Sequence, residues 1–250
     1  MKLEKDFTLI SGASSGIGRE VAIKLSETRN LVLSGRRIEE LEISQNLCNK
    51  DSDVRIWVSD FENSDAIRIA LRDFLKEEEI QISEFVNCAG QVEVNPIRLN
   101  THEKTLRALQ VNFLSPIEIV SELLSKVSNN RLLSNCVFIS SIWSKGGVAG
   151  YTNYSGSKAA LDGAMRSMAV ELAPKVRVNS IVLGAVDTPM SKAVLSDETL
   201  SSKLRERYPL GVGTTEDVAN LVNFLLSNEA RWMTGQQVVL DGGRTINYSY

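Results

Sequence analysis

The sequence predicts an α/β fold, a single doubly wound Rossmann-type domain whose seven-stranded parallel sheet is flanked by helices on both faces. Short apolar runs alternate with longer helical patterns along 250 residues, without a linker or an internal repeat. This length suits one large α/β domain. A glycine-rich turn also follows the first apolar run directly. Because parallel strands need helical crossovers of one hand, the alternation favours a sheet covered on both faces.

Seven strands and six helical segments make up the expected order. The strands are expected at residues 7–11, 31–35, 55–59, 84–87, 136–140, 177–183 and 237–240. The helical patterns between them cover residues 16–28, 38–48, 64–78, 101–128, 151–173 and 216–227. The polar stretch from 188 to 210 fits no regular element. We expect it to be a substrate lid at the carboxyl edge of the sheet, within one catalytic domain that spans residues 1–250.

Composition and charge exclude several classes of protein. The net charge is −3 and no long basic run occurs, which disfavours nucleic acid and anionic membranes as partners. Three cysteines, Cys48, Cys88 and Cys136, form no CxxC pair, as is usual for reduced thiols in the cytoplasm. The one histidine, His102, argues against a His-built metal site, so no metal is expected. Strand-like residues follow the charged N-terminus at once and no 18-residue apolar run occurs, so we expect a cytoplasmic protein.

The turn after the first strand has the spacing G-x-x-x-G-x-G and leads into a helix. Glycines allow a pyrophosphate to approach the backbone, and the helix N-terminus adds unpaired N–H groups. The candidate phosphate-binding residues are Gly12, Ser14, Ser15, Gly16, Ile17 and Gly18. An ordinary tight turn is the alternative interpretation.

The end of the second strand indicates which nucleotide binds. Dinucleotide-binding sheets that prefer NAD commonly place an acid there, against the ribose 2′-hydroxyl. Here the strand ends in Gly35 and is followed by Arg36 and Arg37. A guanidinium group suits the 2′-phosphate of NADP(H), and Arg36 lies closer to the strand end. The alternative is a solvated basic turn.

Three further residues suggest acid–base chemistry. Tyr154 and Lys158 are four residues apart in a helical pattern, so their side chains share a face. A neighbouring ammonium group favours a phenolate, so Lys158 is expected to lower the pKa of Tyr154. Ser141 ends the fifth strand, where its hydroxyl would face the ligand crevice. Taken alone, each feature also fits an ordinary surface helix or strand end.

These motifs together resemble the classical short-chain dehydrogenase/reductase family over essentially the whole chain, and the general pattern is similar to 3-oxoacyl-acyl-carrier-protein reductases. The matching elements fall in the family's order: Gly12–Gly18, Asp60, Asn87-Cys-Ala-Gly90, Asn112, Ser141, Tyr154 with Lys158, Asn179 to Gly184 with Thr188, and Thr234-Gly235 before Asp241-Gly-Gly243.

The resemblance implies a role for each matching residue. Tyr154 would donate the proton in reduction, while Lys158 would lower its pKa and hold the nicotinamide ribose. Ser141 would position the substrate oxygen, and Asn112 would retain a water that links Lys158 to solvent. The remaining cofactor-binding residues that it implies are Asp60 and Phe61 near the adenine, Asn87, Ala89 and Gly90 beside the adenine ribose, and Val186 and Thr188 at the carboxamide.

Some positions depart from the family pattern. Cys88 replaces a common asparagine, for which we expect a small loss of stability and no loss of function. Leu183 stands where proline is common, so the following loop loses a rigid φ. Ser15 occupies the second position that is often basic in NADP-binding relatives, so the preference for NADP(H) could be incomplete.

The expected function is NADP(H)-dependent hydride transfer to or from a carbonyl or secondary alcohol, with a 3-oxoacyl thioester as one candidate. The alternative is a non-catalytic nucleotide-binding regulator of the same fold. Candidate substrate-pocket residues are Gln91, Val92, Trp143, Ser144, Val148, Tyr151, Ala185, Met190 and Val194. An acyl carrier protein would meet basic residues near the site mouth, for which Lys126, Arg131 and Lys175 are candidates. The resemblance also implies a homotetramer or homodimer formed through the helices in 101–128 and 151–173.

Overall fold

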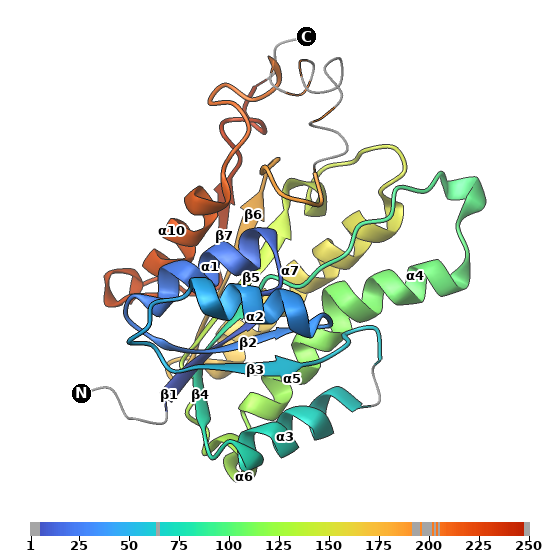
Figure 1. The fold of residues 1–250 in the computed structure, drawn as a ribbon. Coiled ribbons are helices and arrows are strands. Elements are labelled where there is room, and N and C mark those ends of the chain that lie inside the picture. The colour runs from blue at the N-terminus through green and yellow to red at the C-terminus, as the bar shows by residue number, and fades with distance from the viewer. Residues whose placement is uncertain are drawn as a thin grey trace.

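In the computed structural model, strand β1 (Asp6–Ser11) lies inside a seven-stranded sheet. The structure describes residues 6–63, 66–191, 196, 202, 204 and 206–247. The strand order is β3-β2-β1-β4-β5-β6-β7 (Figure 1). Every neighbouring pair is parallel. The other strands are β2 (Asn30–Gly35), β3 (Val54–Val58), β4 (Gln81–Asn87), β5 (Asn135–Ser141), β6 (Arg177–Leu183) and β7 (Gln237–Leu240). The predicted fold class is therefore confirmed.

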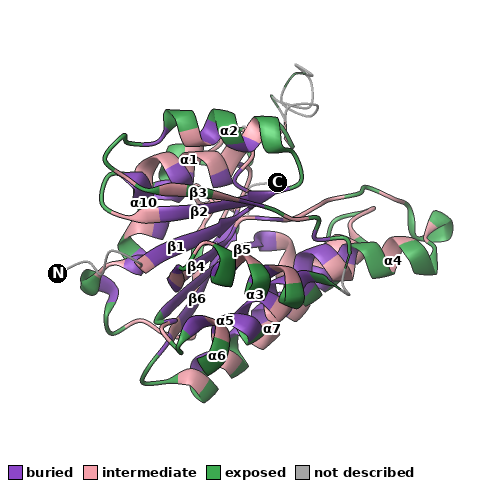
Figure 2. Ribbon diagram, turned by 60° about the horizontal axis from the view of Figure 1, so that its bottom comes forward, coloured by how far each residue is buried: buried purple, intermediate pink, exposed green. Residues whose placement is uncertain are grey.

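Helices cover both faces of the sheet, and the buried strands lie between them (Figure 2). On one face lie α1 (Gly16–Ser26), α2 (Ile38–Leu47) and α10 (Thr215–Leu226), and on the other lie α3 (Ile67–Glu77), α5 (Ser115–Leu123) and α7 (Thr152–Leu172). Alternating strand residues supply the two cores. Leu31 and Leu33 belong to one apolar cluster and Val32 to the other. Strands that bury both faces have to read as continuous apolar runs, which explains the sequence pattern.

The helical stretch predicted at 101–128 is not one regular helix. It begins with α4 (His102–Leu109), continues through a π-helical turn (Gln110–Leu114) into α5, and breaks before α6 (Lys126–Asn129). The Ser125 hydroxyl accepts hydrogen bonds from the first N–H groups of α6, so it starts a new helix. The predicted helix at 64–78 begins at Ile67, and residues 64 and 65 lie outside the described residues.

The direction of the strands separates the two edges of the sheet. All seven carboxyl ends meet at one edge, where ligands bind in folds of this kind. Lys126 and Arg131 lie before the start of β5, and Lys175 lies before the start of β6. These three basic residues therefore lie at the amino edge, and the prediction that they flank the site mouth is wrong. Within the described part of the chain, no helix is both long and apolar enough to cross a membrane.

Candidate active site

The glycine-rich turn between β1 and α1 can hold only glycine at its tightest points. Gly12 has a φ of 70°, and a Cβ built on it would lie 2.7 Å from the backbone nitrogen of Ala89. A Cβ on Gly18 would collide with the carbonyl oxygen of Gly12. Ser15 directly precedes α1, yet its side chain makes no capping hydrogen bond. The first N–H groups of α1 are thus left for an anion.

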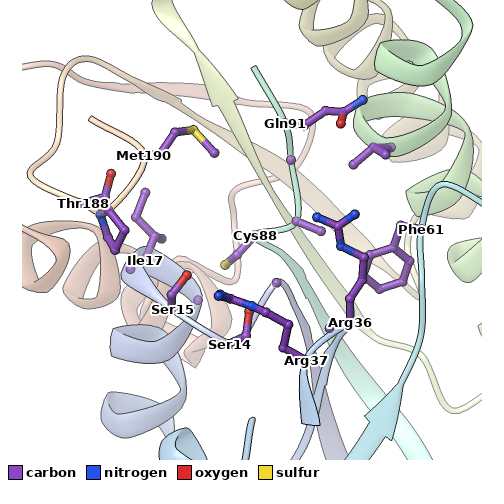
Figure 3. Close-up of a pocket in the computed structure, with 18 of the residues that line it drawn as sticks. Ser14, Ser15, Ile17, Arg36, Arg37, Phe61, Cys88, Gln91, Thr188 and Met190 are labelled. Carbon is purple, nitrogen blue, oxygen red and sulfur yellow. The ribbon is translucent and has the colours of Figure 1, made fainter. Parts of the chain in front are cut away.

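A cavity of about 290 Å³ opens above this turn at the carboxyl edge (Figure 3). Its lining residues are Gly12, Ser14, Ser15, Gly16, Ile17, Gly18, Gly35, Arg36, Arg37, Asp60, Phe61, Glu62, Cys88, Ala89, Gly90, Gln91, Val111, Thr188, Pro189 and Met190. Thirteen of these were predicted to bind the cofactor, and they come from the ends of four neighbouring strands and the turn after β6.

Arg36 and Arg37 reach from the end of β2 over the cavity (Figure 3). The Arg36 guanidinium donates from Nη1 to Oε1 of Glu62 at 3.0 Å. The other carboxylate oxygen of Glu62 lies 3.8 Å from Nε of Arg107. Glu62 was missed from the sequence, because it is 26 residues from Arg36 and no motif joins them.

The turn after β3 also lines the cavity, close to Arg36. The Asp60 side chain accepts a hydrogen bond from the Glu62 N–H at 3.1 Å, so it shapes its own turn. Phe61 is buried and packs edge-on against Trp57, and its carbonyl accepts a hydrogen bond from Ser115. Asp60 thus remains exposed at the cavity, while Phe61 anchors the turn in the core.

Ser141, Tyr154 and Lys158 converge beside this cavity. The hydroxyls of Ser141 and Tyr154 form a side-chain hydrogen bond. The Lys158 ammonium lies 5.9 Å from the centroid of the Tyr154 ring and donates to the carbonyl of Ile139 at 2.9 Å. A Cβ built on Gly90 would lie 3.3 Å from Nζ of Lys158. The ammonium therefore lies next to Gly90, which lines the cavity.

Burial changes the acid–base properties of this group. It raises the pKa of Tyr154 above its usual value, and the hydrogen bond with Ser141 opposes this change only in part. Burial also lowers the pKa of Lys158 to about 8, against the opposing effect of Asp162. The pKa of Tyr154 is thus raised in the protein without cofactor, and the lowering by Lys158 stays a prediction. Desolvation of the phenolate is the largest cause of this shift.

Asn112 lies in the π-helical turn and is fully buried. Its side chain exchanges two hydrogen bonds with the backbone of Gln91, and its Nδ2 also donates to Ser157. A Cβ built on Gly90 would lie 3.2 Å from Oδ1 of Asn112, and the same Cβ would lie near Nζ of Lys158. Asn112 therefore joins α5, α7 and the turn after β4, and its oxygen faces the same point as the ammonium.

Four predicted cofactor-binding residues are not among those that line the cavity: Tyr154 and Lys158, which lie beside it, and Asn87 and Val186. Asn87 is buried in the sheet, where its Oδ1 accepts from Ser11, and its Nδ2 has no hydrogen-bond partner among the described residues. Val186 packs into the core and pairs with Gly213. Cys88 does line the cavity, and burial raises the pKa of its thiol to about 12, so the thiol stays protonated.

The turn after β6 is organised by residues that the sequence did not single out. The Ser191 hydroxyl contacts the backbone and side chain of Thr188 and donates to the carbonyl of Val186. Tyr208 is buried against Gly184, and its hydroxyl accepts from the N–H of Ala185 at 2.9 Å. These contacts hold Thr188 at the cavity.

The predicted substrate residues are divided between different places. Gln91 and Met190 line the main cavity. Trp143 instead lines a second cavity of about 250 Å³ beside β6 and β7, with Lys145 and Arg244. Val194 lies outside the described residues. No group of three or more His, Cys, Asp or Glu side chains able to hold a metal occurs among the residues that the structure describes.

The chemistry of the cavity fits a nicotinamide dinucleotide. The glycines let the turn fold tightly against the Ala89 backbone, and the first N–H groups of α1 stay available where a pyrophosphate would lie. The guanidinium groups of Arg36 and Arg37 and the side chain of Thr188 line the cavity, and Lys158 lies next to Gly90 of its lining. Arg36, Arg37 and Asp60 would hold the adenosine part, the turn the pyrophosphate, and Lys158 and Thr188 the nicotinamide half.

Comparisons with known proteins agree with this arrangement. A family model described as enoyl-(acyl carrier protein) reductase matches residues 12–245. The 3-oxoacyl-(acyl-carrier-protein) reductase FabG of Aquifex aeolicus is 32% identical over 261 residues, covering 97% of this chain and 98% of that protein. D-erythrulose reductase of Gallus gallus is 29% identical over 242 residues, covering 96% and 95%. A structure of 4-hydroxyisoleucine dehydrogenase complexed with NADH has a TM-score of 0.89 at 26% identity, covering 97% and 99%. The chain therefore belongs to the short-chain dehydrogenase/reductase family, whose members are oxidoreductases that bind a nicotinamide cofactor.

Proposed function

We propose that this protein is an NADP(H)-dependent oxidoreductase that transfers a hydride between nicotinamide and a carbonyl or secondary alcohol. The observation that supports this most is the hydrogen-bonded pair of Ser141 and Tyr154 beside Lys158, whose ammonium lies next to Gly90 of the cavity lining. These residues come from a strand end and a helix, so the fold itself brings them together. A nucleotide-binding regulator would not need a buried ammonium beside a buried phenol.

In this mechanism the chain supplies the proton. A nicotinamide cofactor held by Lys158 and Thr188 would supply the hydride for the carbonyl carbon. The Tyr154 hydroxyl donates its proton to the carbonyl oxygen, while the Ser141 hydroxyl holds that oxygen. The Lys158 ammonium stabilises the phenolate that forms, and this opposes the effect of burial on the pKa of Tyr154. In oxidation the phenolate accepts the proton from the alcohol.

Lys158 also suits proton resupply. Its pKa of about 8 allows the ammonium to give up a proton and regain it near neutral pH. Asn112 Oδ1 and Lys158 Nζ face the same point beside Gly90. A water held by Asn112 there would connect Lys158 with solvent. Asn112 thus acts as a positioning residue in this proposal.

The preference for NADP(H) rests on the end of β2. Arg36 and Arg37 line the cavity there, and no carboxylate ends the strand to accept from a ribose 2′-hydroxyl. A guanidinium group binds a 2′-phosphate with charge-assisted hydrogen bonds. The relative that is complexed with NADH shows that the family also uses NAD(H), so the preference has to be measured.

The substrate is a ketone, an aldehyde or the matching alcohol, and a 3-oxoacyl thioester is one candidate. The similarity to FabG of Aquifex aeolicus supports the thioester, with an acyl carrier protein as partner. The similarity to D-erythrulose reductase supports a small hydroxyketone. We further propose a cytoplasmic homotetramer or homodimer of a single-domain chain. The expected substrate lid at 188–210 lies partly outside the described residues.

The test is a fluorescence titration with NADPH and NADH, followed by a screen of ketones, aldehydes and 3-oxoacyl thioesters. Tyr154→Phe should bind NADPH as the wild type does and lose about 10²- to 10⁴-fold in turnover, as expected for loss of a general acid. A variant that keeps full turnover would contradict the mechanism. Binding of NADPH without turnover of any carbonyl would favour the regulatory function instead.

A further inference from the structure

The ion pair between Arg36 and Glu62 lies inside the proposed cofactor cavity. Both residues line the cavity, and the Arg36 Nη1 to Glu62 Oε1 distance is 3.0 Å. Across the described part of the chain, Glu62 is the one ion-pair partner of Arg36. The two side chains are 61% and 36% exposed, so solvent and a ligand can both reach the pair. The guanidinium suited to a 2′-phosphate thus already faces a carboxylate.

We propose that Glu62 is a specificity-determining residue that competes with the 2′-phosphate of NADP(H) for Arg36. The inference rests on the proposed function, since it concerns the cofactor assigned there. A 2′-phosphate bound to Arg36 lies close to the Glu62 carboxylate, and the two anions repel each other. NAD(H) carries a hydroxyl at this position and escapes the repulsion. Glu62 therefore reduces the preference for NADP(H) over NAD(H).

The structure restrains Glu62 in this place. Its N–H donates to Asp60 Oδ1 at 3.1 Å, and the adjacent Phe61 is buried in the core. Its second carboxylate oxygen lies 3.8 Å from Nε of Arg107 on α4. The Glu62 carboxylate thus contacts two cations, Arg36 in the turn after β2 and Arg107 on α4, which restrain it beside the place of a 2′-phosphate. Glu62 therefore presents a negative charge to the cavity beside Arg36.

The matched control is Glu103, which also forms an ion pair with Arg107 but does not line the cavity. Its Oε1 lies 3.0 Å from Nη2 of Arg107, and its side chain is 80% exposed. Glu103→Gln removes one negative charge and one partner of Arg107, as Glu62→Gln does, but leaves Arg36 untouched. A general effect of net charge or of Arg107 would appear in both variants.

The experiment measures dissociation constants for NADPH and NADH by fluorescence, without substrate, for the wild type, Glu62→Gln, Arg36→Gln, the double variant and Glu103→Gln. Glu62→Gln should bind NADPH about two- to fivefold more tightly, the range expected for an exposed ion pair, with NADH unchanged. The gain should shrink in high salt, because screening weakens the repulsion. It should vanish in the Arg36→Gln background, where the competition no longer exists. Glu103→Gln should match the wild type.

Each other outcome overturns a defined part of the argument. Weaker NADH binding in Glu62→Gln, with NADPH unchanged, would make Glu62 a ligand of the ribose hydroxyls instead of a competitor. Unchanged or weaker NADPH binding in Glu62→Gln would refute the competition, while a weakened Arg36→Gln would still support NADP(H) as cofactor. If Arg36→Gln binds both cofactors as the wild type does, the NADP(H) assignment itself fails. A thermal melting curve for each variant confirms that it is folded.

Discussion

Asn112 and Gln91 are joined by two reciprocal hydrogen bonds. The Gln91 N–H donates to Asn112 Oδ1 at 2.8 Å, and Asn112 Nδ2 donates to the Gln91 carbonyl at 2.9 Å. A π-helical turn presents the asparagine to that backbone. Such turns are inserted into helices mostly at functional sites, since they cost regular hydrogen bonding. These two hydrogen bonds hold the loop after β4 against the helical segment that contains Asn112 and packs on α7.

We predict that Asn112→Ala lowers the free energy of unfolding by about 1–3 kcal/mol, because the Gln91 backbone groups lose their buried partners. Turnover should fall while the KM for cofactor changes little, if Asn112 positions the proton path. Urea unfolding and steady-state kinetics measure the two effects. Gln110→Ala, in the same π-helical turn, is the control and should cost less than about 1 kcal/mol, because its partner Ser115 keeps the bond to Phe61. Equal losses in both variants would contradict a special role for Asn112.

Ser141→Ala should raise the pKa of Tyr154 further, because the hydrogen bond with Ser141 is what lowers it. The pH at which alcohol oxidation reaches half its maximum should therefore move upward. Turnover should drop about 10- to 100-fold, as for a lost hydrogen bond to a charged group. Ser155→Ala is the control, because the Ser155 hydroxyl is buried next to Tyr154 without a hydrogen-bond partner in the described residues. An unshifted pH profile in Ser141→Ala would argue against this pairing.

The pKa of Lys158 predicts how stability depends on pH. Burial lowers it from 10.5 to about 8, so between these values the unfolded chain binds more protons than the folded one. The free energy of unfolding must then rise with pH in this window. Relative to Lys158→Met, the wild type should gain about 2 kcal/mol between pH 8 and pH 10. Urea unfolding of both proteins without cofactor measures this difference. A constant difference over that range would mean that Lys158 is not desolvated.

Gly12→Ala should destabilise the protein by about 1–3 kcal/mol and weaken cofactor binding. The positive φ disfavours a side chain, and the new Cβ would lie 2.7 Å from the Ala89 nitrogen. Gly156→Ala is the matched control in α7, where a Cβ would meet nothing within 4 Å. It should stabilise the helix by up to about 1 kcal/mol. Thermal unfolding and NADPH titration test both variants, and a stable Gly12→Ala that binds NADPH normally would show that the turn is not tight.

The sequence was most informative where local rules decide the structure. Buried parallel strands need continuous apolar runs, so all seven were found, with ends that differ by a few residues. Tyr154 and Lys158 were paired correctly because helical spacing alone makes them neighbours. Strand direction alone also places Lys126 and Lys175 at the amino edge, so their distance from the site mouth follows from the sequence order of the elements.

Other features depend on tertiary packing and could not be predicted in this way. The direction of the Tyr154 pKa depends on how far the phenol is buried, which no spacing reveals. The ion pair of Arg36 with Glu62 joins the ends of two strands through side-chain conformations alone. The π-helical turn inside a continuous helical pattern likewise left no signal in the apolar periodicity.

The hydrogen bond from Lys158 to the Ile139 carbonyl has a mechanical consequence. It fastens α7 to β5, the two elements that carry Tyr154 and Ser141. An amine keeps N–H donors after losing its proton, so the fastening survives each cycle of proton loss and gain. The same nitrogen therefore stabilises the phenolate when it is protonated, and it keeps Tyr154 aligned with Ser141 in either protonation state.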